Sequence, residues 1–469
     1  MAGMPVFSRP AGLPPGPPLP ALAQTLAYLA RPAEFMDACY RRYGDCFTMD
    51  TLLFGVQVSI VQPDDIRRFF TSSPDVLRAG EANAALGPIV GPRSILLLDG
   101  AEHLRHRRLL MPPFHGERML SYAATMRAVT EEAVARFPSG GKPFALYPFM
   151  QGITLDIILR TVFGMDEGER ATALRRALLT VLDRLGHPSA ALAIAPALQR
   201  PFFGLSPFAA FQRDMRRADE LIYAQITRRR AEGSSAGART DILAMLLDAR
   251  DESGAPLTDA ELRDELMTLL VAGHETTATM LCWAFDLILT DPRVQRILDG
   301  ELAGAADPTP NDYLDATIKE VLRLRPVIPM VARKLTQPLE IAGHTLPAGM
   351  LVMANAYLTH RLPDIYPEPT AFKPERFLDK KPDPYAWLPF GGGVRRCLGM
   401  AFALLELKVV LATVLGQVKL RKARPRPSRV ALRAFTMVPA DGAEVVMEGS
   451  RARGATSGAE ASRSSELSL

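Results

Sequence analysis

The sequence predicts a mainly α-helical protein with a small β region set to one side, and three observations support this class. Apolar residues recur at three- and four-residue spacing through 119–137, 168–185, 208–232 and 239–250, as they do on the buried face of a helix. A longer helical segment follows at 259–289, with flanks that are apolar on nearly all sides. Strand signals are few and lie toward the two ends of the chain. Helices therefore dominate the predicted fold.

Three segments carry the predicted β structure. Residues 56–61 alternate between apolar and polar side chains, and 95–98 form a short apolar run. Residues 339–355 predict a hairpin, because Gly343 and the later turn at 347–349 interrupt two apolar stretches.

Composition indicates a globular protein of one large domain. The chain has 469 residues, of which 48% are hydrophobic and 23% are charged, enough for a sizeable core. This length favours two domains, but we find no internal repeat and no Gly/Ser-rich linker; the dip at 231–237 is short enough to be a loop. We expect a proline-rich arm at 1–20, a single domain at 21–448 and a disordered tail at 449–469. The arm is expected to be an ordered segment that leads into the domain rather than a ligand for an SH3 domain.

Charge and cysteine content exclude several other classes. The net charge is only +4 with dispersed basic residues, which argues against nucleic-acid binding. The four cysteines form no CxxC pair, so zinc and iron–sulfur sites are not expected. The N-terminus lacks the apolar core of a signal peptide, and charges interrupt the apolar runs before they reach spanning length. We therefore expect a cytoplasmic protein with reduced cysteines and no membrane span.

A proline-broken apolar segment lies between two predicted helices, at 186–207. Such a segment fits a mobile lid over a pocket. It equally fits a surface turn with an apolar underside, and the residues alone leave both interpretations open.

The segment 259–289 predicts a buried helix about 45 Å long. Thr258 with Glu261 forms a capping-box pattern at its start, and Pro292 follows its end. Its middle reads AGHETT at 272–277, where glycine weakens the helix and Thr276 can bond back to a carbonyl one turn earlier. Glu275 beside that hydroxyl suggests a proton path, although a polar cluster at a kink explains the pattern equally well.

A second helix is predicted at 311–324. Glu320 and Arg323 lie three residues apart on it and so share a face. The later segment FKPERF, at 372–377, carries Arg376, which would join the same carboxylate if that loop folds back on the helix.

The segment FGGGVRRCLG, at 390–399, precedes an apolar helix that extends to about residue 416. Three glycines allow the backbone to turn sharply and to pass close to a flat ligand. Cys397 then lies at a helix N-terminus, where amide groups and the helix dipole favour a thiolate. Cys39, Cys46 and Cys282 have no such setting and are expected to be small core residues.

Taken together, these motifs resemble those of the cytochrome P450 superfamily. The segment 390–399 matches its haem-binding pattern Phe-x-x-Gly-x-x-x-Cys-x-Gly, with Phe390, Gly393 and Cys397 at the named positions. AGHETT resembles its oxygen-binding helix, and Glu320 to Arg323 with FKPERF resembles its Glu-x-x-Arg helix and joining arginine. The motifs occur in the family's order, and the resemblance spans the chain to about residue 448. It implies a soluble, triangular helical domain with haem b between the long central helix and the cysteine-loop helix.

The resemblance also implies residue roles. Cys397 would be the axial iron ligand, Thr276 would hydrogen-bond dioxygen, and Glu275 would supply protons. Arg395, Arg333 and Arg107 would bind the haem propionates.

His103, four residues before Arg107, would complete that set of propionate partners; many relatives have tryptophan at its position, and histidine is an accepted variant. Glu320, Arg323 and Arg376 would be structural rather than catalytic.

The function that the resemblance implies is monooxygenation of an apolar substrate, such as a fatty acid, terpenoid, steroid or polyketide-like molecule. The expected pocket lining is 80–92, 269–276, 327–331 and 434–438. No flavin- or NAD-binding glycine loop is visible, so electrons would come from a separate ferredoxin or flavodoxin with its reductase.

Basic residues near the cysteine (Arg395, Arg396, Lys408 and the run 419–429) would dock that acidic carrier. Two alternatives remain at this point: a peroxygenase on the same fold, or a non-catalytic haem sensor.

Overall fold

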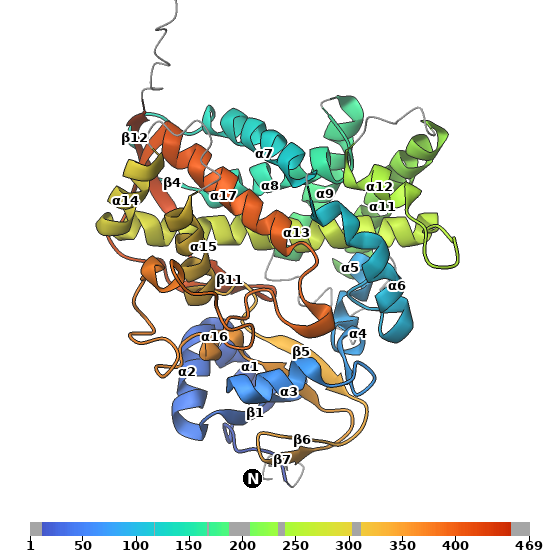
Figure 1. Cartoon of the computed structure of the whole chain (residues 1–469), viewed down its shortest axis with the longest axis vertical. Coiled ribbons are helices and arrows are strands. Elements are labelled where there is room, and N and C mark those ends of the chain that lie inside the picture. The colour runs from blue at the N-terminus through green and yellow to red at the C-terminus, as the bar shows by residue number, and fades with distance from the viewer. Residues whose placement is uncertain are drawn as a thin grey trace, which may run out of the picture.

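The computed structural model describes residues 12–116, 118–166, 168–186, 207–232, 240–302 and 311–451. The expected lid segment at 186–207 lies almost entirely outside these residues. Helices make up most of the described chain, and the strands gather mainly with the N-terminal helices (Figure 1).

The longer helices of the helical part are α6 (Gly100–Leu110), α7 (Arg118–Val134), α8 (Tyr147–Thr161), α9 (Glu169–Gly186), α11 (Pro207–Glu232), α12 (Ile242–Asp248), α13 (Asp259–Thr290), α14 (Pro292–Leu302), α15 (Asp312–Leu324) and α17 (Met400–Gln417). The helices near the sheet, or short turns beside it, are α1 (Ala21–Ala30), α2 (Pro32–Tyr43), α3 (Pro63–Thr71), α4 (Ala79–Ala82), α5 (Gly87–Val90) and α16 (Ala356–Thr359). The helical periods found in the sequence are thus confirmed to within a few residues.

The largest sheet has five strands in the order β1 (Cys46–Thr51), β2 (Gly55–Ile60), β8 (Leu351–Ala354), β5 (Val331–Leu335) and β3 (Leu77–Arg78). Only the β2–β8 pair is parallel. A second sheet has the order β4 (Phe144–Ala145), β12 (Glu444–Ser450) and β9 (Val418–Lys422). Two hairpins complete the β structure: β6 (Leu339–Ile341) with β7 (His344–Leu346), and β10 (Val430–Arg433) with β11 (Thr436–Pro439).

Helix α13 is the central element of the fold. Its capping box is present, with Thr258 accepting from the Glu261 backbone and Glu261 accepting from that of Thr258. It runs unbroken through the AGHETT segment and ends at Thr290, with Asp291 as its C-cap before Pro292. At about 1.5 Å per residue its 32 residues span about 48 Å, and Figure 1 shows it crossing the molecule with α17 in front of it.

Two strand predictions need correction. Residues 95–98 form turns, not a strand, because local turn bonds and distant side chains, rather than a neighbouring strand, satisfy their backbone groups. The Ile95 amide donates to Glu265 Oε1 at 2.9 Å, and its carbonyl accepts from Arg395. The segment 339–355 is a hairpin only in its first half; its second half, β8, joins the large sheet.

The two ends of the described chain are tied to the domain. In the arm, the carbonyls of Pro14 and Pro15 accept from the Thr48 side chain and amide at 2.7 and 2.8 Å. At the other end β12 continues to Ser450, two residues beyond the expected limit of the domain.

One described helix, α17, is long and apolar enough to meet a length-and-composition test for membrane spans. It nonetheless packs across α7 and α13, and its central residues, such as Val410 and Leu411, are fully buried. Core helices of soluble proteins commonly pass the same test, so this finding is weak evidence for a span.

Candidate active site

The cysteine loop is closed by backbone hydrogen bonds before α17 begins. The Cys397 amide donates to the Phe390 carbonyl at 2.9 Å, and the Arg396 amide donates to the Gly393 carbonyl at 3.1 Å. Gly391 and Gly393 both have φ of +63°, which L side chains rarely adopt. The glycine-rich sequence is therefore required by the path of the backbone.

The same loop lies directly against α3. A Cβ added at Gly392 would come within 2.5 Å of Phe70 Cδ2, and one at Gly393 would overlap the Phe70 carbonyl oxygen. Phe70 belongs to α3, so this close approach joins the cysteine loop to the N-terminal part of the fold.

We expect Gly393→Ala to lower the free energy of unfolding by about 2–5 kcal/mol, from its positive φ and its overlap with a backbone atom. Urea unfolding measures the change, and haem content reports on the loop itself. Gly416→Ala is the matched control: it lies in α17 with no heavy atom within 4 Å of the added Cβ, so it should be neutral or stabilise by up to ~1 kcal/mol. Equal stability of Gly393→Ala and wild type would contradict the argument.

Cys397 lies at the end of this loop, just before α17 begins. Its side chain is solvent-accessible, yet enough protein surrounds it that desolvation raises the pKa of its thiol. The Gly399 amide and the positive charges of Arg107 and Arg396 act in the opposite direction and favour the thiolate. The other cysteines are free thiols, with Cys39 and Cys282 buried and Cys46 half-buried, as expected for core residues.

Four predicted cofactor-binding residues converge beside this loop. His103 and Arg107 come from α6, Arg333 from β5 and Arg395 from the cysteine loop. Burial, then the charges of Arg395, Arg107 and Arg333, lower the pKa of His103 to about 3, so its imidazole is neutral. Burial and Arg395 lower the pKa of Arg333 to about 10. Contacts agree with this placement: the His103 amide donates to the Asp99 carbonyl at 3.4 Å, Arg395 pairs with the Asp99 carboxylate, and Arg333 lies over the Phe69 ring, next to Phe70 at the loop.

The site has too few acids to balance its arginines. Arg395 Nη2 lies 2.6 Å from Asp99 Oδ1, and Asp99 also accepts from the backbone amides of Gly80 and Glu81. Within the described part of the chain, neither Arg107 nor Arg333 has an acidic partner in hydrogen-bonding or ion-pair contact. Two positive charges are therefore uncompensated, which matches the two propionates of haem b.

The face of α13 that carries the AGHETT segment is open over one stretch. Leu269, Ala272, Gly273 and Thr276, spaced three or four residues apart, are partly or fully exposed, while the flanking turns are buried. Thr276 Oγ1 donates to the Ala272 carbonyl at 2.5 Å, as the sequence predicted, without breaking the helix.

Glu275 lies on a different side of the helix from Thr276. Its carboxylate oxygens accept from the Tyr147 hydroxyl at 2.7 and 2.6 Å, and Gln151 Nε2 lies 3.4 Å from one of them. Burial raises the pKa of Glu275, and Tyr147 and Arg433 oppose this. The predicted acid and alcohol are thus adjacent in sequence but have separate partners.

The predicted Glu–Arg–Arg cluster is confirmed. Glu320 and Arg323 are fully buried and form a bidentate pair, at 2.7 Å for both contacts. Arg376 Nε lies 3.4 Å from Glu320 Oε1. Arg323 also donates to the carbonyls of His360 and Pro369, so the cluster anchors the loop that returns toward the cysteine.

His360 is a site residue that sequence reasoning missed. Its Nδ1 lies 2.9 Å from the Arg323 carbonyl, and its Nε2 accepts from the Leu388 amide at 2.7 Å. Because the ring accepts at Nε2, Nδ1 carries the proton and donates. His360 therefore links the end of α15 to the start of the cysteine loop, a long-range contact with no sequence signal.

Burial lowers the pKa of His360 to about 3, well below its ordinary value near 6.5. Between these values the unfolded chain binds a proton that the folded chain excludes. The stability from the neutral ring is therefore fully present above about pH 6.5 and lost as pH falls toward 3, by ~1.4 kcal/mol per pH unit.

We expect His360→Gln, which retains an acceptor for Leu388, to reduce the pH dependence of the free energy of unfolding by about this slope between pH 6 and 4. Urea unfolding across this range measures it. An unchanged slope would contradict the assignment.

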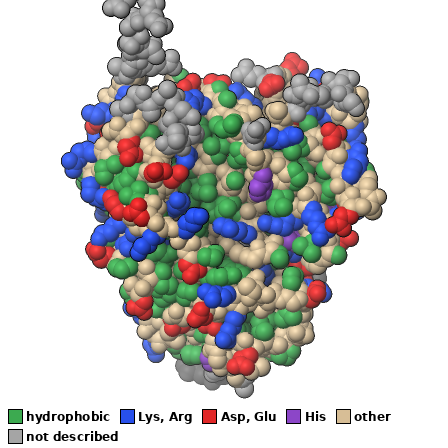
Figure 2. All heavy atoms as spheres, in the orientation of Figure 1, with side chains coloured by type: hydrophobic (Ala, Val, Ile, Leu, Met, Phe, Trp, Pro, Cys, Tyr) green, Lys and Arg blue, Asp and Glu red, His purple; other side chains and the backbone are tan. Residues whose placement is uncertain are grey.

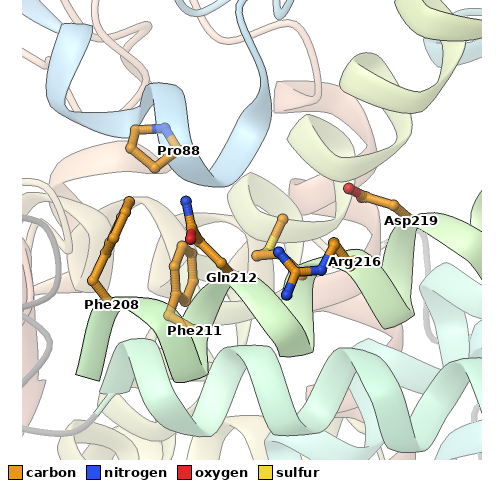
Figure 3. A pocket seen from close by; sticks show the side chains of 7 residues that line it. Pro88, Phe208, Phe211, Gln212, Arg216 and Asp219 are labelled. Atoms are coloured by element: carbon orange, nitrogen blue, oxygen red, sulfur yellow. The ribbon is translucent and has the colours of Figure 1, made fainter. Parts of the chain in front are cut away.

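An open pocket of about 380 Å³ lies between α5 and α11. Figure 3 shows Phe208, Phe211 and Gln212 of α11 pointing toward Pro88 of α5. Its lining combines apolar and polar side chains, and both helices pack against α13.

Comparison with known proteins decides the family. The sequence model of the cytochrome P450 family matches residues 13–440. The chain belongs to the cytochrome P450 family. It is 42% identical to cytochrome P450 135B1 of Mycobacterium tuberculosis over 96% of this chain and 94% of that protein. It is 39% identical to cytochrome P450 135A1 of the same organism over 92% and 95%.

Solved cytochrome P450 structures have the same fold. Retinoic-acid-bound cyanobacterial CYP120A1 matches with a TM-score of 0.78 and 26% identity, covering 94% of this chain and all of that one. The haem domain of cytochrome P450DA matches with a TM-score of 0.80 and 25% identity, covering 94% and 98%. Family members are generally haem-thiolate monooxygenases, so the protein is an oxidoreductase of this class.

Proposed function

We propose that the protein inserts one atom of dioxygen into an apolar substrate, with haem b ligated by Cys397 and electrons from a separate carrier. The observation that carries this proposal is the convergence of His103, Arg107, Arg333 and Arg395 beside a glycine loop that presents an accessible thiol. When bound, haem supplies the redox chemistry that puts one oxygen atom into the substrate and releases the other as water.

The chain's own residues would bind the haem, orient the cysteine loop and supply protons. Arg107, Arg333 and Arg395 would neutralise the propionates, with neutral His103 as a hydrogen-bonding partner. Arg395 would then share its guanidinium between Asp99 and a propionate. Phe390 and Gly393 would hold the loop that aims Cys397. Thr276, on the open face of α13, would hydrogen-bond dioxygen. Glu275, the preceding residue of the helix, would supply protons.

An apolar substrate is favoured by the surroundings of that open face. Leu269 and Val271 lie on α13, and Phe435 is exposed at the tip of the β10–β11 hairpin. The similar CYP120A1 structure holds retinoic acid. We propose a substrate of the fatty acid, terpenoid, steroid or polyketide-like class.

The carrier would dock on the face that bears α6 and the start of α17, where Lys and Arg side chains gather in a band (Figure 2). The expected docking residues need revision. Lys408 pairs with Asp315, and Lys422 is buried against Asp286 at 2.6 Å. The run at 419–429 also begins after the C-terminus of α17. That helix is about 27 Å long, and Cys397 precedes its N-terminus.

Of the expected residues near the cysteine, Arg395 is largely buried against Asp99, and Arg396 is exposed; Arg68, on α3 against the loop, was not expected but is also exposed. We propose these two as contacts for an acidic ferredoxin or flavodoxin, and a cytoplasmic location in which such carriers occur.

The test is product formation under oxygen-18-labelled dioxygen, with NADPH and a surrogate ferredoxin and its reductase. Substrates are first chosen from fatty acids, steroids and retinoids by the shift they cause in the haem spectrum. One labelled oxygen atom in the product is expected. Equal activity with hydrogen peroxide alone would indicate a peroxygenase, and spectral shifts without any product would indicate a sensor.

A further inference from the structure

Glu275 is held by a chain of hydrogen bonds that all point toward its carboxylate. Gln151 Nε2 donates to the Tyr147 oxygen at 2.8 Å, and the Tyr147 hydroxyl donates to both carboxylate oxygens. A hydrogen bond to an ionised acceptor is roughly twice as strong as one between neutral groups. These hydrogen bonds therefore stabilise the ionised carboxylate and oppose the effect of burial, which raises the pKa of Glu275.

Tyr147 is itself fixed on every side. It begins α8, and its amide donates to the Gly442 carbonyl at 3.1 Å. Its ring is buried, and the Arg433 guanidinium carbon lies 4.1 Å from the ring centroid. The position of the Tyr147 hydroxyl is therefore fixed. The Glu275 side chain, with its rotatable bonds, is the partner that can turn.

Adjacent residues on a helix project about 100° apart. Glu275 reaches α8, while Thr276 lies on the open face and bonds back to Ala272. A proton on Glu275 reaches Thr276 only if the carboxyl group turns away from Tyr147. Protonation weakens the bond that prevents this turn, because it removes the charge that strengthens the bond.

We propose that Tyr147 is a positioning residue that holds the ionised Glu275 carboxylate against α8 and releases it toward Thr276 once it is protonated. The proton comes from solvent to Glu275 and passes from the carboxylic acid to the Thr276 oxygen, while the Thr276 hydroxyl proton moves on to dioxygen; Glu275 is then ionised again and returns to Tyr147. This inference rests on the proposed function and adds a residue to it.

The groups that act on the charge of Glu275 come from three elements. Tyr147 and Gln151 of α8, Arg433 of β10 and Thr279 of α13 all lower its pKa against the effect of burial. Cys282 is a further titratable neighbour whose pKa burial and Glu275 raise. Removing the Tyr147 hydroxyl should therefore shift the titration of Glu275 to higher pH.

The first measurement is infrared titration of the protonated carboxyl band in the resting protein, which needs no turnover. Glu275→Gln assigns the band by removing it. The midpoint should move to higher pH in Tyr147→Phe and in Arg433→Met, and should stay at the wild-type value in Tyr122→Phe. Tyr122 is the matched control, a buried tyrosine whose hydroxyl donates to the Thr240 carbonyl at 3.2 Å. An unmoved midpoint in Tyr147→Phe overturns the proposal.

The second measurement is product formed per NADPH across pH. Tyr147→Phe should shift this profile to higher pH, whereas Glu275→Gln should lower it by about tenfold or more. Adding Tyr147→Phe to Glu275→Gln should cause no further change, and an additive loss overturns the proposal. A wild type with no thiolate-type Soret band would instead overturn the proposed function, and the infrared result would still stand on its own.

Discussion

The reduced, carbon-monoxide-bound protein should lose its thiolate-type Soret band when Cys397 is replaced by alanine, and turnover should fall by more than about 100-fold. Loss of a group that merely orients a metal ligand costs roughly 10–100-fold in metal affinity or activity, so loss of the ligand itself should cost more. Among the described residues, the Cys397 thiol is the one presented by the glycine loop beside Arg107 and Arg333.

Cys46→Ala is the matched control for this experiment. Cys46 is a free, half-buried cysteine at the start of β1, away from the loop. Its replacement should leave the Soret band and the activity unchanged. An imidazole-type band in wild type, or a thiolate-type band that survives in Cys397→Ala, would exclude Cys397 as the ligand.

The helices that frame the site were predictable because their signals are local. The ends of α13 follow from the Thr258–Glu261 capping box and from Pro292, within one turn of the helix itself. The start of α15 likewise follows from Asn311, whose side chain accepts from the Leu314 amide at 2.7 Å. Such contacts join residues three positions apart, so sequence alone contains them.

The errors arose where backbone partners are distant in sequence. The run at 95–98 is apolar enough for a strand, but Glu265 and Arg395, about 170 and 300 residues later, take its backbone groups. Nothing near residue 95 signals those partners. The same reason explains why Lys422 was expected at a docking surface although Asp286 holds it in the core.

The site was predicted in its residue types but not in its supports. The family resemblance was enough to select Arg333 and Arg395, and in the structure both lie close enough to His103 to lower its pKa. Asp99, His360 and Tyr147 were missed because each acts through hydrogen bonds to residues distant in sequence and belongs to no motif.

The buried pair of Glu320 and Arg323 should give the largest stability effect. Arg323→Ala is expected to lower the free energy of unfolding by about 3–5 kcal/mol, the usual cost of leaving one member of a buried ion pair unpaired. Both side chains are fully buried, and Arg323 also donates to backbone carbonyls at His360 and Pro369. Urea unfolding of the haem-loaded protein measures the change.

Arg217→Ala provides the comparison at the surface. Arg217 pairs with Glu220 at 3.0 Å, but both side chains are more than 60% exposed, so the loss should be below about 1 kcal/mol. If Arg323→Ala fails to accumulate as folded protein, Arg376→Ala offers a milder test, because this partly exposed arginine contacts Glu320 at 3.4 Å. Equal effects for the buried and surface arginines would contradict the argument.

The order in which the cysteine loop and the helices unfold should identify what the Glu320–Arg323 pair supports. Arg323 holds the His360 carbonyl, and His360 in turn accepts from the Leu388 amide, two residues before the cysteine loop begins. Weakening the cluster should therefore loosen this loop before α13, whose capping box is independent of it and which packs mainly against α8 and α17. We expect the Soret band of Arg323→Ala or Arg376→Ala to be lost at a lower urea concentration than the helical circular dichroism, whereas the two transitions coincide in Arg217→Ala.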